Sequence, residues 1–464
     1  MKSLPLLALI LAFAATSPAT AALDPDVAKA QALVAAGKYV KAADAYVLAL
    51  DRDPDNYDAL MGLAQICIDA ELLDDGLVWV QGALRVRPGD HDALIARAKI
   101  HAGLGDLDKA SADYEKILAG GPDAQALHGR GTILSLRGDH ARALDTFKAA
   151  YRLDPKQAKS LVWAANELEA LERPDEALAH YEEALLLDPK NYDALLGRGA
   201  LLVLKENYVA ATETYQTADR LYPKTAHIQV LLGDVWSARL EPTKAMTFYN
   251  AAVKLDPKSL YAWWHRGFAL VNEGKLKAGL ESYDRAVQID PVNAELLIER
   301  GSSRALAEDA DGALTDYEAA LKIEPKSAEA LYQRGSLFMD AENYDRAMAD
   351  FDAAIAEDPQ HAAALRDRAF VYREQGRNDR AMQDINRAIA LEPSALNHFA
   401  KGAIYVEMGD HLQALEAFDR AIALNASPAI FWWVRGETKI ALGDAAGGAA
   451  DQAHARKLDP KVAG

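Results

Sequence analysis

The sequence predicts an all-α protein, an α-solenoid in which antiparallel helix pairs are stacked one after another. Prolines return every 33 or 34 residues along almost the whole chain, and small residues hold the same places between them. Within each interval the apolar residues lie three and four positions apart, which is the spacing of one helix face. A fixed period of this length is the signature of a repeat protein.

Residues 1–21 have the pattern of a secretory signal peptide. Lys2 precedes an apolar stretch from Leu4 to Ala15, and Ala19-Thr20-Ala21 supplies small residues at the spacing that a signal peptidase reads. We expect cleavage after Ala21 and a periplasmic or secreted protein, with a eukaryotic secretory lumen as an alternative. An uncleaved anchor is the other interpretation, although the apolar run is short for a bilayer span.

Residues 22–460 are predicted to form about thirteen repeats, and residues 461–464 a short tail. The closing residues of the repeats are 54, 88, 122, 155, 189, 223, 257, 291, 325, 359, 393, 426 and 460, of which only Ala426 is not proline. The residues 24 and 12 positions before each closing residue are always alanine or glycine, and the residue 8 positions before it is aromatic in ten repeats. This period replaces the roughly three ordinary domains that the chain length would suggest.

The middle of each repeat is predicted to be a turn between two helices. In Gly138-Asp139 and Gly409-Asp410 the glycine suits the end of a first helix and the aspartate the start of a second. Pro174 and Pro242 lie just after this break, where a helix tolerates proline. The small residues allow close approach of the helices, the aromatic fills the space between repeats, and the closing proline ends the second helix.

This pattern resembles the tetratricopeptide repeat. The repeat that closes at Pro291 shows it well, with Trp263, Gly267, Leu270, Gly274, Tyr283, Ala286 and Pro291. The resemblance covers nearly all of the chain after the signal segment. It implies a right-handed superhelix with a concave groove, which in this family usually binds peptides or other proteins.

The charge and cysteine content exclude several classes of protein. The chain has 51 basic and 69 acidic residues, a net charge of −18, and such a surface repels phosphate backbones and anionic membranes. We therefore expect no nucleic-acid partner. The overall composition, 50% hydrophobic and 26% charged residues, excludes a multi-span membrane protein, and we expect no membrane span. The single cysteine, Cys67, rules out an internal disulfide framework and is expected to be a buried core thiol.

No pattern of catalytic residues is present. The eleven histidines are scattered, without an HExxH pair, and neither a GxSxG nucleophile elbow nor a P-loop occurs. Gly129-Arg130-Gly131 and Gly197-Arg198-Gly199 look like partial phosphate loops, but they fall inside predicted helices, where helix packing explains them better. We expect no enzyme activity, no cofactor and no metal site.

One pattern of charges repeats. Arginine lies 25 positions before the closing residue in eight repeats, and five of these also carry aspartate 9 positions before it. The geometry predicts bidentate ion pairs across the helix pair, a structural ladder more than a ligand site. The five pairs are Arg97–Asp113, Arg300–Asp316, Arg334–Asp350, Arg368–Asp384 and Arg435–Asp451.

The candidate binding residues belong to the first helices of the C-terminal half. By helical geometry, the residue 27 positions before each closing residue and the residue four later face the groove. In the N-terminal half these places are smaller or polar, whereas in the C-terminal half they are rich in aromatic residues, which are typical anchors of recognition. Packing against the preceding helix is the alternative interpretation. The predicted peptide- or protein-binding residues are Tyr261, Trp264, Phe268, Tyr332, Arg366, Phe370, Phe399 and Trp433.

These observations predict a non-enzymatic scaffold of the bacterial cell envelope that binds a basic or apolar peptide or partner protein in its concave groove. The alternative is an accessory subunit of an envelope machine that exports or assembles polysaccharide or protein. Some members of the family grip a carboxylate terminus with a Lys/Asn/Arg set on adjacent first helices, and this chain lacks that set.

Overall fold

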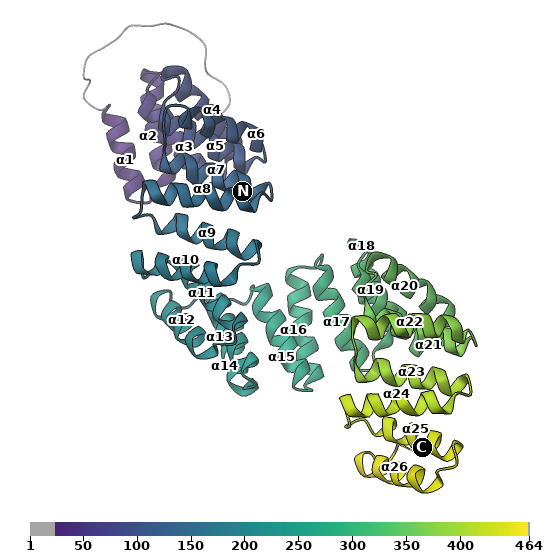
Figure 1. The fold of residues 1–464 in the computed structure, drawn as a ribbon. Coiled ribbons are helices and arrows are strands. Elements are labelled where there is room, and N and C mark those ends of the chain that lie inside the picture. Colours follow the sequence, from purple (N-terminus) through teal and green to yellow (C-terminus); the bar gives the residue numbers. More distant parts are fainter. Residues whose placement is uncertain (1–23, 463–464) are drawn as a thin grey trace. The chain divides into compact units, whose positions relative to one another are not determined.

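The computed structural model describes residues 24–462, so the predicted signal peptide lies outside the described residues. Residues 24–462 form 26 helices joined by short turns and contain no strand, which confirms the predicted all-α class (Figure 1). The chain divides into two compact units, residues 1–221 and residues 222–464. We call them the N-terminal and the C-terminal unit and describe each by itself.

The N-terminal unit holds twelve of the helices. In order they are α1 (Pro25–Ala35), α2 (Tyr39–Arg52), α3 (Tyr57–Asp69), α4 (Leu73–Val86), α5 (His91–Gly103), α6 (Leu107–Leu118), α7 (Ala124–Leu136), α8 (His140–Leu153), α9 (Ala158–Ala170), α10 (Pro174–Leu187), α11 (Tyr192–Leu204) and α12 (Tyr208–Leu221).

The C-terminal unit holds the remaining fourteen. They are α13 (Ala226–Ala238), α14 (Pro242–Leu255), α15 (Leu260–Asn272), α16 (Leu276–Ile289), α17 (Ala294–Leu306), α18 (Ala310–Ile323), α19 (Ala328–Asp340), α20 (Tyr344–Glu357), α21 (Ala362–Glu374), α22 (Asn378–Leu391), α23 (Ala395–Glu407), α24 (His411–Leu424), α25 (Ala429–Ala441) and α26 (Ala445–Leu458).

The turn inside each helix pair requires a residue with a left-handed backbone. Gly138 and Gly409 take positive φ angles of 75° and 77° there, as expected of a glycine that ends a helix. Six turns place another residue at this point, and Leu240 adopts a φ of 59°. A residue other than glycine is strained at such a positive φ angle, because its Cβ atom crowds the backbone. These six turns are therefore less favourable than the glycine turns.

The helix starts follow the sequence in most pairs. The Asp139 carboxylate accepts a hydrogen bond from the Arg142 backbone N–H at 3.3 Å and caps α8, and Pro174 and Pro242 begin α10 and α14. Asp106 differs, because it makes no capping bond to α6. Its carboxylate accepts a bond from Lys109 Nζ at 2.7 Å instead.

The core consists of rings packed against glycine. A Cβ atom on Gly199 would lie 2.2 Å from Cε1 of the buried Tyr215, so only glycine fits there. Gly129 and Gly197 play the same role for Tyr114 and Tyr181 of the preceding helix pairs. The two partial phosphate-loop patterns are therefore helix-packing positions. Cys67 is also buried, as predicted.

The odd-numbered and even-numbered helices form different sides of each unit. Most consecutive odd-numbered helices contact one another directly, as α13 does α15 and α21 does α23, whereas no two even-numbered helices among those described have contacts of this extent. The first helix of each pair therefore lies on the inner side of the stack. We call the surface formed by α13, α15, α17, α19, α21, α23 and α25 the first-helix face.

Candidate functional site

All eight predicted binding residues lie on odd-numbered helices of the C-terminal unit. Three of them are on α15, one on α19, two on α21, one on α23 and one on α25. Side chains of this face reach from one odd-numbered helix to the next. His265 of α15, for example, shares a hydrogen bond of 2.7 Å between its Nδ1 and the Oδ1 of Asp234 on α13.

Among the predicted binding residues, the most accessible aromatic side chains are on α15. Tyr261 is 58% exposed and Phe268 is 48% exposed. They are seven residues apart, two turns of one helix face, and Trp264 lies between them. Trp264 is half-buried against the core around Tyr283 and Leu296. In the stripe Tyr261, Trp264 and Phe268, the central ring is therefore packed against the core and the two outer rings are exposed.

Tyr332, Arg366 and Asp367 form a hydrogen-bonded group that joins α19 to α21. The Tyr332 hydroxyl donates to Asp367 Oδ2 at 3.1 Å, and Arg366 donates from Nε to Asp367 Oδ1 at 2.8 Å. Arg366 Nη2 also approaches the Tyr332 hydroxyl at 3.4 Å. Burial, together with the Asp367 charge, raises the pKa of Tyr332 above its usual value. Arg366 is thus already paired with a carboxylate of its own chain.

Phe370, Phe399 and Trp433 are partly buried by their neighbours. Phe399 stacks on Phe431 of α25, with ring centroids 4.6 Å apart. The Arg373 guanidinium lies 4.6 Å from the Phe370 ring centroid, and Trp433 donates from Nε1 to Glu437 Oε1 at 3.0 Å. Much of their surface contributes to packing, and their role in binding stays a prediction.

The first-helix face holds carboxylates that the sequence analysis did not single out. Asp234 accepts a hydrogen bond from the Tyr249 hydroxyl at 2.7 Å, and Glu299 accepts one from the Tyr283 hydroxyl at 2.9 Å. Further carboxylates on odd-numbered helices are Glu329 and Asp340 of α19. Burial and the nearby Asp367 raise the pKa of Asp340. Comparing these helices position by position would have revealed the acidic groups.

Two exposed apolar residues were also missed. Leu396 of α23 and Ile430 of α25 are both exposed. Each lies 30 positions before the closing residue of its predicted repeat, the same place that Tyr261 has before Pro291. That shared position is the signal by which they could have been found.

The N-terminal unit has an aromatic cluster of a different kind. The His128 ring lies 5.3 Å from Phe147 and 6.1 Å from Trp163, measured between centroids. Burial, with a smaller contribution from Lys159 and Lys99, lowers the pKa of His128 to about 4. A neutral imidazole in an apolar cluster is a packing element.

The predicted ladder of arginine–aspartate pairs is confirmed in all five places. In each, Nε and Nη2 of the arginine donate to the two carboxylate oxygens of the aspartate at 2.6–2.9 Å. Three of the arginines also reach an aspartate of the preceding helix pair. These contacts are Arg300–Asp284, Arg368–Asp352 and Arg435–Asp419.

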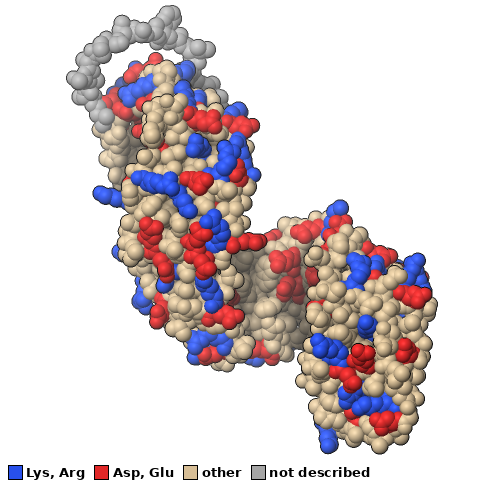
Figure 2. All heavy atoms as spheres, viewed as in Figure 1, with Lys and Arg blue, Asp and Glu red and all other residues tan. Residues whose placement is uncertain are grey.

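Charged side chains of both signs are distributed over the surface. On the side seen in Figure 2, basic and acidic groups alternate in both units. Within residues 24–462, no group of His, Cys, Asp and Glu side chains is arranged to hold a metal ion. No helix in this range has both the length and the apolar character to cross a lipid bilayer.

A family model described as tetratricopeptide repeat matches residues 95–158, 164–226, 241–294, 332–395 and 399–463. A second model with the same description matches residues 33–100. No curated protein matches the chain.

Two solved structures are similar to the chain, and the first of them shares its fold. The APC/C hetero-tetramer Cut9-Hcn1 contains a chain that is 14% identical, with a TM-score of 0.53 over 95% of this chain and 94% of that one. A tetratricopeptide repeat protein from Parabacteroides merdae is 23% identical, with a TM-score of 0.46 over 53% of this chain and 98% of its own.

Proposed function

The chain belongs to the tetratricopeptide repeat family, and from this we propose that it is a non-enzymatic scaffold of the bacterial cell envelope. Its ligand is an extended segment of a partner protein that carries basic and apolar side chains. The binding surface is the first-helix face of the C-terminal unit.

The observation that carries this proposal is the exposure of Tyr261 and Phe268 on the inner side of the helix stack. Among the residues that the structure describes, Tyr39 of α2 is the one other Tyr, Phe or Trp residue that is exposed, and the remaining rings of these types are buried or partly buried. Covering an exposed ring with apolar side chains of a ligand is worth about 1.5–3 kcal/mol. Two such rings on one face of α15, with Trp264 between them, are suited to anchor an apolar segment.

The charge of the ligand follows from the carboxylates around these rings. Asp234, Glu299 and Glu329 lie on the helices that flank α15 and continue beyond it, and the whole chain carries a net charge of −18. A basic ligand complements these carboxylates and the negative net charge. This complementarity speeds association and selects against acidic competitors. Because Arg366 is paired with Asp367, it offers little attraction to an acidic ligand.

The test uses exposed residues, so that the variants keep their fold. Random peptides displayed on phage are selected on the protein that begins at residue 22, and the selected peptides are expected to be rich in Lys, Arg and apolar residues. Tyr261→Ala plus Phe268→Ala should weaken their binding at least tenfold, or about 1.4 kcal/mol. Leu412→Ala, an exposed position on α24 of the same unit, is the matched control and should change nothing.

Acidic consensus peptides, or equal binding to the double variant and the control, would overturn the proposal. Melting curves of all three proteins show whether the substitutions have left the fold unchanged.

The envelope location rests on the signal-peptide pattern of residues 1–21. Periplasmic fractionation and N-terminal sequencing of the native protein are expected to give a mature chain that starts at Ala22. A chain recovered with Met1 in the cytoplasm would contradict this location. The role of an accessory subunit in an export or assembly machine uses the same surface, and the neighbouring genes distinguish it from a general scaffold.

A further inference from the structure

Between α17 and α26 the ladder of ion pairs is interrupted in one helix pair. The pairs before and after it, α21–α22 and α25–α26, hold the contacts Arg368–Asp384 and Arg435–Asp451. In α23–α24 the same positions are occupied by Lys401 and Ala417. The cation is retained, and the carboxylate that would neutralise it is missing.

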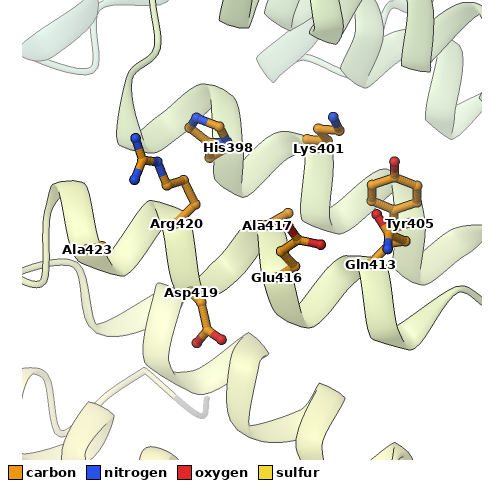
Figure 3. A pocket seen from close by; sticks show the side chains of 9 residues that line it. All are labelled: His398, Lys401, Tyr405, Gln413, Glu416, Ala417, Asp419, Arg420 and Ala423. Atoms are coloured by element: carbon orange, nitrogen blue, oxygen red, sulfur yellow. The ribbon is translucent and has the colours of Figure 1, made fainter.

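The gap is an open pocket between α23 and α24. Its volume is about 520 Å³, and α23 contributes His398, Lys401 and Tyr405 to its lining. Figure 3 shows His398 and Arg420 at one end, Tyr405 and Gln413 at the other, and Lys401 between them. The small Ala417 leaves the space open.

The pocket has an excess of unpaired positive charge. Among residues 24–462, no carboxylate forms an ion pair with Lys401 or Arg420, and the nearest aromatic contact of Lys401 is the Tyr405 ring at 5.8 Å. Asp419 at the pocket edge is bound by Arg435 Nη1 at 2.7 Å, which leaves Glu416 as the one unpaired acid. Burial, and then repulsion by Arg420 and Lys401, lowers the pKa of His398.

One helix pair of the N-terminal unit that lacks the aspartate leaves a buried donor of its arginine without a partner. Arg130 of α7 has Thr146 where other pairs have aspartate, and the Thr146 hydroxyl donates to the Arg142 carbonyl at 2.7 Å. The buried Nε of Arg130 has no hydrogen-bond partner among the described residues. A pocket of about 300 Å³ opens beside it.

We propose that the pocket between α23 and α24 binds a carboxylate group of another molecule, in the place that an aspartate side chain fills in neighbouring helix pairs. Lys401 and Arg420 donate charge-assisted hydrogen bonds to it, the strong kind for this chemistry. The carboxylate comes from an acidic peptide segment or from a small free dicarboxylate. The pocket is lined by residues of both α23 and α24, and it includes none of the eight predicted peptide-binding residues.

The experiment measures the melting temperature of the protein that begins at residue 22 with succinate, with an amidated tetraglutamate peptide, or with phosphate, at equal ionic strength set with NaCl. Succinate or tetraglutamate is expected to raise the melting temperature of the unaltered protein, and phosphate is expected to act no more than chloride does. A response to succinate alone identifies a small dicarboxylate, and a response to the peptide identifies an acidic segment.

Two variants test the location. Ala417→Asp supplies the missing carboxylate internally, so it is expected to raise the melting temperature without ligand and to abolish the response. Lys401→Met is expected to abolish the response and keeps the test decisive if Ala417→Asp does not fold. Ala449→Asp, an exposed position on α26, is the matched control and should respond like the unaltered protein. Equal responses in Lys401→Met and the unaltered protein, or a response to phosphate alone, would overturn the proposal.

Discussion

Arg300 donates from Nε and Nη2 to the two carboxylate oxygens of Asp316, at 2.9 and 2.6 Å, across the helix pair α17–α18. Its Nη1 reaches back to Asp284 of the preceding pair at 2.8 Å. The side chain of Asp316 is only 2% exposed. Arg300 of α17 therefore links α16 and α18 to its own helix. Its contact with Asp316 is shielded from water.

Removing the buried acid is expected to be costly. Asp316→Ala removes the carboxylate that Arg300 and Arg304 share. Asp284 still pairs with both arginines, but their buried N–H donors lose an acceptor, which costs about 1–3 kcal/mol of unfolding free energy. Lys326→Ala breaks an ion pair with Glu357 in the same unit that is largely exposed, and should cost less than about 1 kcal/mol. Urea denaturation of both variants measures the difference, and equal losses would contradict a structural role for the ladder.

Leu240 is expected to be a stabilising site of mutation. It is 88% exposed and has a φ of 59°, so Leu240→Gly relieves backbone strain without loss of packing. The expected gain in unfolding free energy is about 1 kcal/mol. Gly274 occupies the same turn one pair later with a φ of 75°, and Gly274→Leu should destabilise by a similar amount. Gains or losses of the same sign in both variants would show that the turn strain is not the cause.

His128 is expected to make the N-terminal unit sensitive to acid. Burial holds its folded-state pKa near 4, whereas an unfolded histidine titrates near 6.5. Between these values the unfolded state binds more protons, so stability is lost as the pH falls from about 6.5 to 4. His128→Phe should remove about 1–3 kcal/mol of this loss. Hydrogen exchange of α7 from pH 7 to pH 4.5 measures it, and parallel pH profiles of variant and unaltered protein would contradict it.

His265 is expected to act in the opposite direction. Burial lowers its pKa, but the hydrogen bond and charge of Asp234 outweigh burial and raise it overall. This contribution is fully present below the unfolded pKa and is lost as the pH rises through the folded pKa. His265→Gln should therefore increase hydrogen exchange in α15 at pH 5.5 and have little effect at pH 8.5. An equal effect at both pH values would show that the Asp234 contact carries no charge.

The helix pairs were predictable because the same pattern of residue types returns from one repeat to the next. Proline, glycine and aromatic residues recur at fixed places, so even the pairing of Arg97 with Asp113 could be derived from spacing. The left-handed turn at Leu240 could not, because the glycine that marks this turn elsewhere is absent there.

The binding surface was less predictable, because the same position differs between repeats. Trp264 and Phe399 hold equivalent places, yet Phe399 is stacked on Phe431, a contact that depends on the next helix pair. The sequence predicts Arg366 as a binding residue. Its partner Tyr332 is one repeat earlier, and its partner Asp367 is its neighbour in the chain. Burial and pairing of this kind depend on contacts between repeats, which spacing alone does not reveal.

The central claim is that the first-helix face of the C-terminal unit holds a basic, apolar peptide. A photo-crosslinking amino acid placed at Phe268 or at Leu412, combined with one selected peptide, tests it most directly. The account predicts a crosslinked product from position 268 that excess unlabelled peptide removes, and none from position 412 on α24. Crosslinking of equal yield at both positions, or at 412 alone, would contradict it.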